Sequence, residues 1–452
     1  MQKRKKKSFD TNQIVRKRLL QLVIPIFLLF SPFKVPVNAY YKVEDHLNLI
    51  LQASFDNAYL EQIGRIPGSG VADTTFDQLY KFGKMETVQA CNKMFQYQIS
   101  RTKWRRRRKA YPLAVDWTDI PYYGKAKHLW IVKGKAKAGT IYFHRYLTIS
   151  VVKSKYRFIL LIHPMRRSER KADKLSKLLI HFLTKARKLV RFHSVYFDRG
   201  FFASEIIRGL DAFRPKITYI MAAPRNKKIK RLTKKVEDYY KGRGRFPSTV
   251  EQIRVTRRRI HCKAPHLGYN FPTYLLGIHK YPVRLKIWKD WCTTKRGKRY
   301  LRDFVYCTNS DRSPEAIHHA YKARFGIETS YRDLGMMRAN TRSNQPQVRF
   351  FFFGVACVLY NAWVATNLNI LSPQKHPRKT SPVTSLDKTD SPYSPPLPLF
   401  DFITLLLGHY TRVDFFIYRK KGPPWVKDDK RLTRVKKSPL SPLNFLVLTY
   451  NV

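Results

Sequence analysis

The stretch HSVYFDRGFF at residues 193–202 decides how the rest of the chain is interpreted. Residues 193–197 have the β-branched and aromatic character of a buried strand, and an acid, Asp198, follows directly. A glycine at 200 and a helix-like segment from Ser204 come next. In an α/β sheet, ligands bind where strands end, so Asp198 lies where a site is expected. Taken alone, the same acid could simply cap the next helix.

The segments on either side of this stretch indicate a mixed sheet. Three strand-like runs precede it, and the second and third are separated by only four residues, which predicts a hairpin. Apolar residues at helical spacing predict a helix over 175–189. Hairpins join antiparallel strands, whereas helical crossovers join parallel ones. The expected strands lie at 111–117, 140–152, 157–165, 193–197 and 217–221. This order resembles that of ribonuclease-H-like α/β folds, in which the first and fourth strands are neighbours.

We expect five regions along the chain. Their bounds follow from changes in charge, periodicity and Ser/Pro content. They are a helical, basic, DNA-binding region at 1–110, the first part of a catalytic core at 111–221, a β-rich basic insertion at 222–309, the C-terminal helices of the core at 310–371, and a Ser/Pro-rich linker with a basic tail at 372–452. A single helix is expected from Ser313 to about Met337.

The charge of the chain indicates a polyanionic partner. Lys and Arg number 89 against 30 Asp and Glu, a net charge of +59, which repels itself unless a polyanion screens it. The basic run at 101–109 contains a tryptophan, and we expect Lys103, Arg105 and Arg106 in it to contact DNA phosphates. Five widely spaced cysteines without a CxxC pair support neither a disulfide framework nor a zinc site. They suit a reducing cytoplasm.

Two apolar stretches, at residues 19–30 and 350–364, could be mistaken for membrane segments. The first follows a basic run, as in a signal peptide, but a proline divides it. The second is shorter than the roughly 18 apolar residues of a spanning helix. We interpret both as helices buried in protein and expect no membrane partner.

Three acids fall at structural junctions: Asp116 in the first strand, Asp198 after the fourth, and Glu328 in a later helix. Clustered carboxylates in so basic a protein predict a cation between them, and Mg²⁺ prefers oxygen ligands. Two such ions can activate an attacking oxygen and stabilise a leaving one on phosphate. Asp119 competes with Asp116 but points to the other face of the strand. We prefer Asp116, because Asp119 is expected to open a turn.

One face of the expected helix carries further groups for DNA. At about 100° per residue, Tyr321, Arg324 and Glu328 fall within roughly 60°, and Arg332 joins them. Arginine binds phosphate through two parallel hydrogen bonds, so this face could hold a DNA strand beside the metal ions.

The pattern Y-x-x-R-x-x-x-E at 321–328, with DWTD at 116–119 and FDRGF at 197–201, resembles insertion-sequence transposases of bacteria and archaea with a DDE site. It is most similar to the branch with a tyrosine, arginine, glutamate and lysine signature. The resemblance implies that Asp116, Asp198 and Glu328 are catalytic and together bind two divalent ions, Mg²⁺ or Mn²⁺. It also implies that Tyr321 and Arg324 bind DNA. The lysine of the signature falls on Gly335, where Arg332 or Arg338 would substitute.

The resemblance further implies cleavage at transposon ends and strand transfer into target DNA. The expected partners are double-stranded terminal inverted repeats and target DNA, with a homodimer on synapsis, in the cytoplasm at the nucleoid. Two alternatives stay open: another ribonuclease-H-like nuclease that only hydrolyses, and a protein that is not an enzyme, either a catalytically inactive DNA-binding relative or a membrane-associated basic protein.

Overall fold

The computed structural model describes residues 23–369, except 24, 66–71, 103–109, 154–155, 241–242, 244, 246–247, 249–250, 253–267, 278–279 and 295–296. The chain divides into two compact units. One comprises Arg107–Thr329, and the other comprises Met1–Arg106 together with Ser330–Val452. The boundary falls within one helix, α11, so the chain passes between the units inside a regular element.

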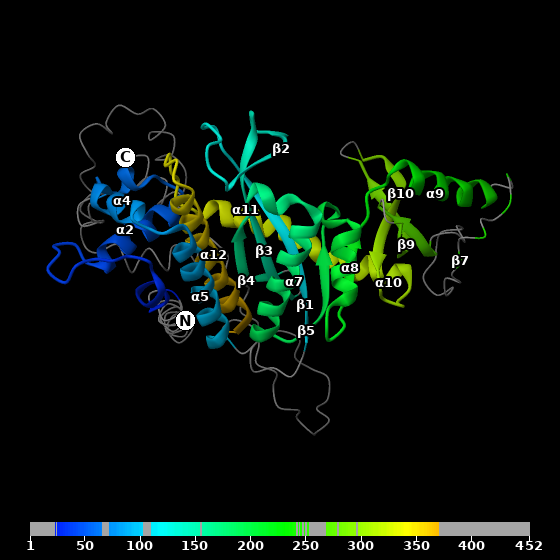
Figure 1. Cartoon of the computed structure of the whole chain (residues 1–452), viewed down its shortest axis with the longest axis horizontal. Coiled ribbons are helices and arrows are strands. Elements are labelled where there is room, and N and C mark those ends of the chain that lie inside the picture. The colour runs from blue at the N-terminus through cyan, green and yellow to red at the C-terminus, as the bar shows by residue number, and fades with distance from the viewer. Residues whose placement is uncertain are drawn as a thin grey trace, which may run out of the picture. The chain divides into compact units, whose positions relative to one another are not determined.

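One mixed sheet runs through the unit Arg107–Thr329 (Figure 1). Its strands are β1 (Tyr111–Pro121), β2 (Ile131–Lys137), β3 (Thr140–Lys153), β4 (Tyr156–Pro164), β5 (Phe192–Phe197), β6 (Thr218–Ala222), β7 (Glu251–Gln252), β8 (Gly268–Leu276), β9 (Tyr281–Thr293) and β10 (Arg299–Thr308). β3 lies antiparallel to β1 and β4, whereas β5 lies parallel to both β1 and β6. The order β4-β3-β1-β5-β6 confirms the expected ribonuclease-H-like arrangement, in which β1 and β5 are neighbours.

Two helices on the crossovers pack together beside this sheet, as Figure 1 shows. They are α7 (Ala172–Leu189) and α8 (Ser204–Ala212). α7 buries Leu175, Leu179, Leu183 and Ala186, which recur at three- and four-residue spacing, and leaves its lysines in solvent. The predicted helix over 175–189 is therefore confirmed. β2 was not predicted, because only its first two residues are buried and the rest is polar.

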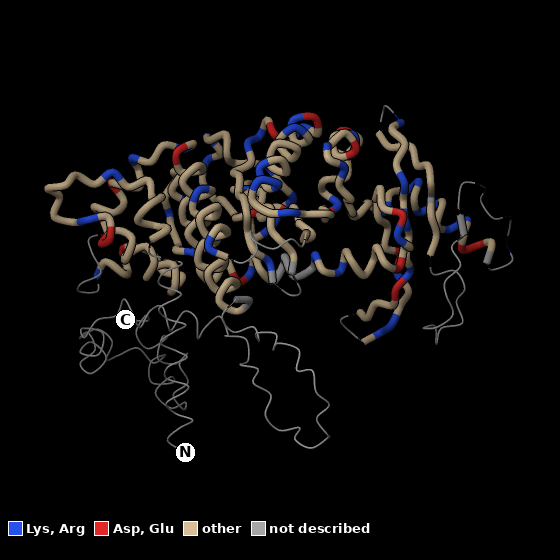
Figure 2. Tube along the Cα trace, turned by 90° about the horizontal axis from the view of Figure 1, so that it is seen from below, with Lys and Arg blue, Asp and Glu red and all other residues tan. Residues whose placement is uncertain are grey.

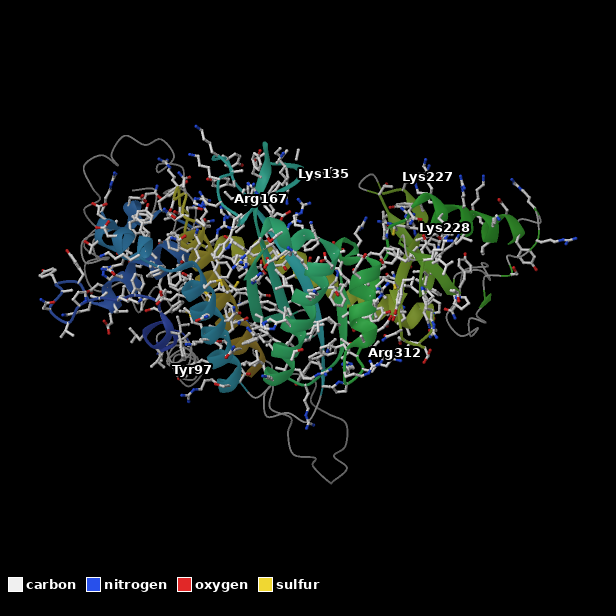
Figure 3. All side chains as sticks on the ribbon, in the orientation of Figure 1. Tyr97, Lys135, Arg167, Lys227, Lys228 and Arg312 are labelled. Atoms are coloured by element: carbon white, nitrogen blue, oxygen red, sulfur yellow. The ribbon has the colours of Figure 1, made fainter. Side chains whose placement is uncertain are left out.

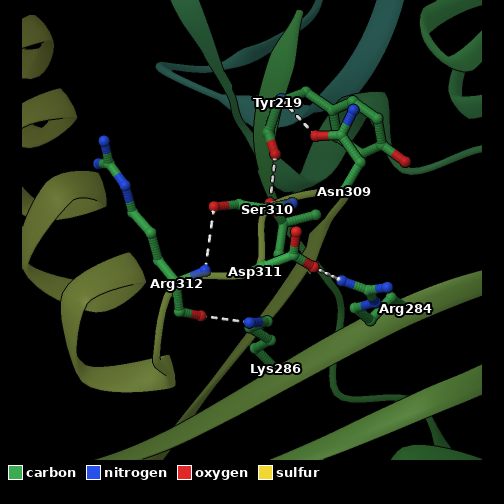
Figure 4. A network of polar contacts seen from close by, with 8 residues as sticks. Tyr219, Arg284, Lys286, Asn309, Ser310, Asp311 and Arg312 are labelled. Carbon is green, nitrogen blue, oxygen red and sulfur yellow. Dashed lines mark hydrogen bonds and ion pairs between the residues drawn. The ribbon is translucent and has the colours of Figure 1, made fainter.

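The β-rich segment after β6 extends the same sheet. β10 pairs antiparallel with β6, and β9, β8 and β7 follow outward. A basic helix, α9 (Lys227–Tyr240), lies between β6 and β7 in the chain. Polar contacts secure the junction: Thr308 donates to the Tyr219 carbonyl at 2.6 Å, and Asn309 accepts from the Tyr219 amide at 3.0 Å (Figure 4). Lys286 of β9 donates to the carbonyl of Arg312, just before the next helix.

The segment after β10 differs from the single helix that we expected. The structure has α10 (Pro314–Lys322), one 3₁₀ turn, η4 (Ala323–Phe325), and then α11 (Gly326–Met336). Ser313 caps α10 by accepting from the amide of Ala316, and Pro314 is the first helical residue. The tighter turn at η4 changes the angular spacing beyond Lys322, so the helical-face argument does not extend to Glu328 or Arg332.

The other unit is helical in its described residues. It contains α2 (Val43–Phe55), α3 (Leu60–Ile63), α4 (Ala72–Tyr80), α5 (Lys84–Arg101) and α12 (Pro346–Asn369). α12 packs against α5 and α2, and Gln98 of α5 donates to the carbonyl of Val358 at 2.8 Å. Pro346–Asn367 is long and apolar enough to cross a membrane by length and composition, which the shorter stretch at 350–364 did not suggest. Of its most apolar window, 89% is buried inside the protein, as in a core helix.

Candidate active site

Asp116 and Asp198 follow the same step of two parallel strands. Val115 of β1 pairs with Phe197 of β5. Asp116 is the next residue of β1, and Asp198 is the residue directly after β5. Both strands reach this point through buried apolar residues, at 113–115 and 195–197; β5 ends there, whereas β1 continues to Pro121. Asp116 is itself buried, at 7% exposure, while Asp198 is half-buried beside solvent. Two carboxylates thus lie side by side where β5 ends.

One guanidinium joins these carboxylates. Arg324 donates from Nη1 to Asp116 Oδ2 at 2.8 Å and from Nη2 to Asp198 Oδ1 at 3.4 Å. Arg324 is only 4% exposed. Burial alone would lower its pKa, yet Tyr321 and the two carboxylates raise the pKa above the usual value. Arg324 therefore stays charged, and its positive charge balances the two neighbouring carboxylates.

Tyr321 ties α10 to the end of β5. Its hydroxyl donates to the carbonyl of Phe197 at 2.9 Å, directly before Asp198. Its ring lies 5.3 Å from the Arg324 guanidinium carbon, and burial raises the pKa of its hydroxyl well above the usual range. Tyr321 and Arg324 are thus brought to the two aspartates. Their predicted contacts with DNA stay a prediction.

A rigid frame surrounds Asp116. Its Oδ1 accepts from the amide of Trp117 at 2.8 Å, and the Trp117 ring packs on Phe201 at 4.3 Å. Added to Gly200, a Cβ atom would overlap the Trp117 indole, so the glycine permits this close approach. Asp119 does not open a turn as expected but lies within β1, where Arg145 grips both its oxygens at 2.6 and 2.7 Å. Asp119 is thus already neutralised by another partner.

The remaining predicted residues are placed as follows. Glu328 lies in the first turn of α11, and its side chain is outside the described part of the structure. Arg332 is exposed in α11, and Arg338 is half-buried just beyond that helix. Both belong to the unit that comprises Met1–Arg106 and Ser330–Val452. Lys103, Arg105 and Arg106 lie outside the described residues, as do residues 370–452.

A second polar cluster, formed with β9 and β10, contacts the inner face of α10. His318 is fully buried; its Nδ1 lies 2.8 Å from the Tyr306 hydroxyl and its Nε2 lies 3.0 Å from Asp290 Oδ2. Asp290 also accepts from Lys322 at 2.6 Å. We did not predict this cluster. His318 lies three residues before Tyr321 on the inner face of α10, and that spacing was its only signal in the sequence.

The donor set at the two aspartates fits a hard divalent ion. Carboxylate oxygens are the ligands that Mg²⁺ and Mn²⁺ prefer, and both carboxylates already converge on one cationic group. Among the described residues, no group of three His, Cys, Asp or Glu side chains could hold a metal ion. Glu328 falls outside that set, so its part in the site stays a prediction.

Residues 107–362 match the family described as transposase DDE domain. No curated protein matches the chain. One similar solved structure is the cryo-EM structure of the piggyBac transposase synaptic complex with hairpin DNA. It shares 11% identity at a TM-score of 0.47, covering 94% of this chain and 84% of that chain. An identity this low does not transfer a function.

Proposed function

We propose that Asp116, Asp198 and Glu328 form the catalytic site of this chain, which belongs to the transposase DDE domain family and is a DNA transposase. The proposed reaction is metal-dependent cleavage at the transposon ends, followed by strand transfer into target DNA. The observation that carries the proposal is the convergence of Asp116 and Asp198 on one buried guanidinium. Two acids beside each other need a positive group between them, and phosphodiester chemistry uses a divalent ion there.

Glu328 completes the site by its position in the chain. It comes four residues after Arg324, in the first turn of α11, and so is close along the chain to the guanidinium that both aspartates hold. Because Arg324 is tied to both aspartates, the turn directly before α11 is held beside Asp116 of β1 and the end of β5. Asp116, Asp198 and Glu328 would then hold Mg²⁺ or Mn²⁺, in our proposal as two ions.

The bound ions would polarise the scissile phosphate and lower the pKa of an attacking hydroxyl. The protein's own residues do the remaining work. Asp116 is kept in place by the Trp117 amide, and Asp198 by the strand end that Tyr321 secures. If a divalent ion bound the two carboxylates, Arg324 would be freed from them and would be able to bind a phosphate oxygen of the DNA strand.

The DNA partner in this proposal is the terminal inverted repeat, followed by target DNA. Arg332, Arg338 and the basic run at 103–106 are proposed to contact its phosphates. Synapsis of two ends requires two copies of the site, so we propose a homodimer on DNA, acting at the nucleoid.

Labelled DNA tests the proposal. The genomic DNA that brackets the reading frame is expected to contain inverted repeats, and a duplex ending in one is incubated with Mg²⁺ and a target plasmid. We expect cleavage and joining by the wild-type chain, and loss of both in Asp198→Asn at unchanged DNA affinity. Asp173→Asn, which removes the same charge at an exposed position of α7, should keep both reactions.

Each other outcome has a defined meaning. Product that is hydrolysed but never joined would indicate a nuclease instead of a transposase activity. Tight DNA binding without any cleavage by the wild-type chain would indicate a catalytically inactive relative. Cleavage that survives in Asp198→Asn would show that the chemistry lies elsewhere.

A further inference from the structure

Helix α9, in the segment that extends the sheet, concentrates positive charge that the proposed site does not use. Seven exposed cations occur within eleven residues: Arg225, Lys227, Lys228, Lys230, Arg231, Lys234 and Lys235. Figure 3 shows Lys227 and Lys228 at the start of this helix, and the basic residues recur along the described trace in Figure 2. We propose that α9 binds the phosphate backbone of duplex DNA without reading its sequence. This inference rests on the proposed function as a transposase.

The charges of α9 lie on one face. At about 100° per residue, the six helical cations fall within an arc of roughly 160°, from Lys230 to Lys228. The buried residues Ile229, Thr233 and Val236 fall within about 60° of each other on the opposite side. The helix is therefore seated on its unit by one stripe and presents six cations on the opposite face, where Asp238 near the C-terminal end is an acid in the same arc.

This arrangement opposes the stability of the helix itself. Lysines in the first turn face the positive end of the helix dipole, and Glu237 and Asp238 follow at its negative end. Lys227–Arg231, Lys230–Lys234 and Arg231–Lys235 are like charges one turn apart, which repel. Among the described residues, none of these side chains has an acidic partner within an ion-pair distance. A local rule broken this consistently points to a bound polyanion.

The anchoring of α9 makes its cationic face a fixed surface. Asn226 caps the helix by accepting from the Ile229 amide at 2.9 Å, and its own amide donates to the Tyr274 hydroxyl of β8 at 3.1 Å. Lys228 lies over the Tyr274 ring at 4.8 Å. The start of the helix is thus held on β8 of the extended sheet by side-chain contacts.

The residue types favour a ligand whose sequence is not read. Five of the six helical cations are lysines, which act as mobile point charges and not as the planar forks that recognise guanine. Asn226, the amide side chain that begins the helix, is already used as a cap. Sequence-independent binding suits target or flanking DNA, which has no defined sequence, better than the terminal repeats.

The salt dependence of binding tests this inference. A labelled duplex of arbitrary sequence is titrated with the full-length chain at several NaCl concentrations. The slope of log affinity against log salt reports the number of phosphates neutralised. In Lys230→Gln/Arg231→Gln/Lys234→Gln we expect a slope that is shallower by up to about 2.7. The matched control, Lys174→Gln/Lys177→Gln/Lys188→Gln, removes three exposed charges from α7 and should change the slope little.

A second variant, Lys227→Gln/Lys235→Gln, tests the same face if the first fails to fold. An unchanged slope in a folded α9 variant would overturn the inference. So would a loss confined to terminal-repeat DNA, or a loss of binding to anionic phosphatidylserine vesicles without a loss on DNA. Cleavage of the transposon ends at saturating DNA should persist in both α9 variants. Asp198→Asn should do the opposite, abolishing cleavage and leaving the salt slope intact. The two sets of variants therefore show separately whether the α9 inference or the proposed catalytic site is wrong.

Discussion

Arg324 neutralises two acids that would otherwise repel each other at the end of β5. Removing one partner of a buried ion pair leaves an uncompensated charge and costs about 3–5 kcal/mol. Because Asp198 is partly exposed, we expect Arg324→Gln to lower the free energy of unfolding by about 3 kcal/mol in EDTA, measured in urea. Arg324→Lys should restore only part of this, since one ammonium cannot bridge both carboxylates in the same way.

Although Arg324→Gln should lose stability, it should bind divalent metal ions more tightly. With the guanidinium gone, Mn²⁺ meets no competing cation, so its affinity measured by electron paramagnetic resonance should rise in Arg324→Gln relative to the wild-type chain. Arg199→Gln, an exposed arginine directly after Asp198, is the control and should change stability by no more than about 0.5 kcal/mol. Equal Mn²⁺ affinity in all three proteins would contradict a metal site at Asp116 and Asp198.

Two glycines should respond in opposite directions to the same change. Gly200→Ala places a methyl group against the Trp117 indole and should lower stability by about 1–3 kcal/mol. Gly335→Ala, within α11, meets open space and should raise stability by about 1 kcal/mol through helix propensity. Both are measured as shifts in the urea midpoint. A loss at Gly335 would mean that the position is constrained by something besides helix formation.

The residue scale also shows which parts of the site were predictable. Alternation along a strand separated Asp116 from Asp119, and the structure gives them different partners, Arg324 and Arg145. The role of Arg324 as a bridge was not predictable, because it depends on two residues more than a hundred positions away. Tyr321 was singled out by the Y-x-x-R-x-x-x-E pattern, but its hydrogen bond to a backbone carbonyl has no signal in the sequence.

At the scale of elements, α10 is held between the end of β5 and the cluster on β9 and β10. Burial lowers the pKa of His318 below its usual 6.5, although Asp290 raises it in part. The neutral ring suits its contacts, with Nε2–H donating to Asp290 and Nδ1 accepting from Tyr306. When pH falls below about 6.5, the unfolded chain binds a proton at this position before the folded chain does. Stability therefore falls as pH decreases from about 7 to 5.

His318→Gln should remove that share of the pH dependence. We expect its urea midpoint to change less between pH 7 and pH 5 than that of the wild-type chain, because the slope reports the protons bound on unfolding. His46, His181 and His193 have pKa values lowered by burial as well, so a dependence of the same sign will persist. His319→Gln, at the exposed neighbouring position, is the control. An identical pH slope in His318→Gln and the wild-type chain would contradict the neutral buried imidazole.

The elements that were predicted are those with a strong period. α7 has apolar residues at helical spacing, and β5 is rich in β-branched and aromatic residues, so both were found. α9 was missed because its buried face consists of only three residues, Ile229, Thr233 and Val236, which are surrounded by lysines in the sequence. The break at η4 was missed because the apolar and aromatic residues of α10 continue smoothly into it, and hydrogen bonding, not composition, separates the two.

At the scale of the whole chain, a long-range pairing fixes the helical unit. α12 lies against α5, and Asn361 donates to Gln98 at 3.1 Å across 263 positions of sequence. Hydropathy alone makes α12 a candidate membrane span, and its neighbours explain the apolar surface instead. No local pattern could predict which earlier helix would cover it.

The net charge of +59 should give stability and DNA binding opposite responses to salt. Salt shortens the Debye length from about 10 Å at 0.1 M to about 3 Å at 1 M and screens self-repulsion in the compact state. We therefore expect the thermal midpoint of the free protein to rise with NaCl, while its affinity for DNA falls over the same range. Sucrose at equal osmolality is the control for excluded solute, and Lys230→Gln/Arg231→Gln/Lys234→Gln should show a smaller rise because it carries less charge to screen. A midpoint that falls with NaCl would mean that ion pairs such as Arg324 with Asp116 and Arg145 with Asp119 outweigh the repulsion among the cations.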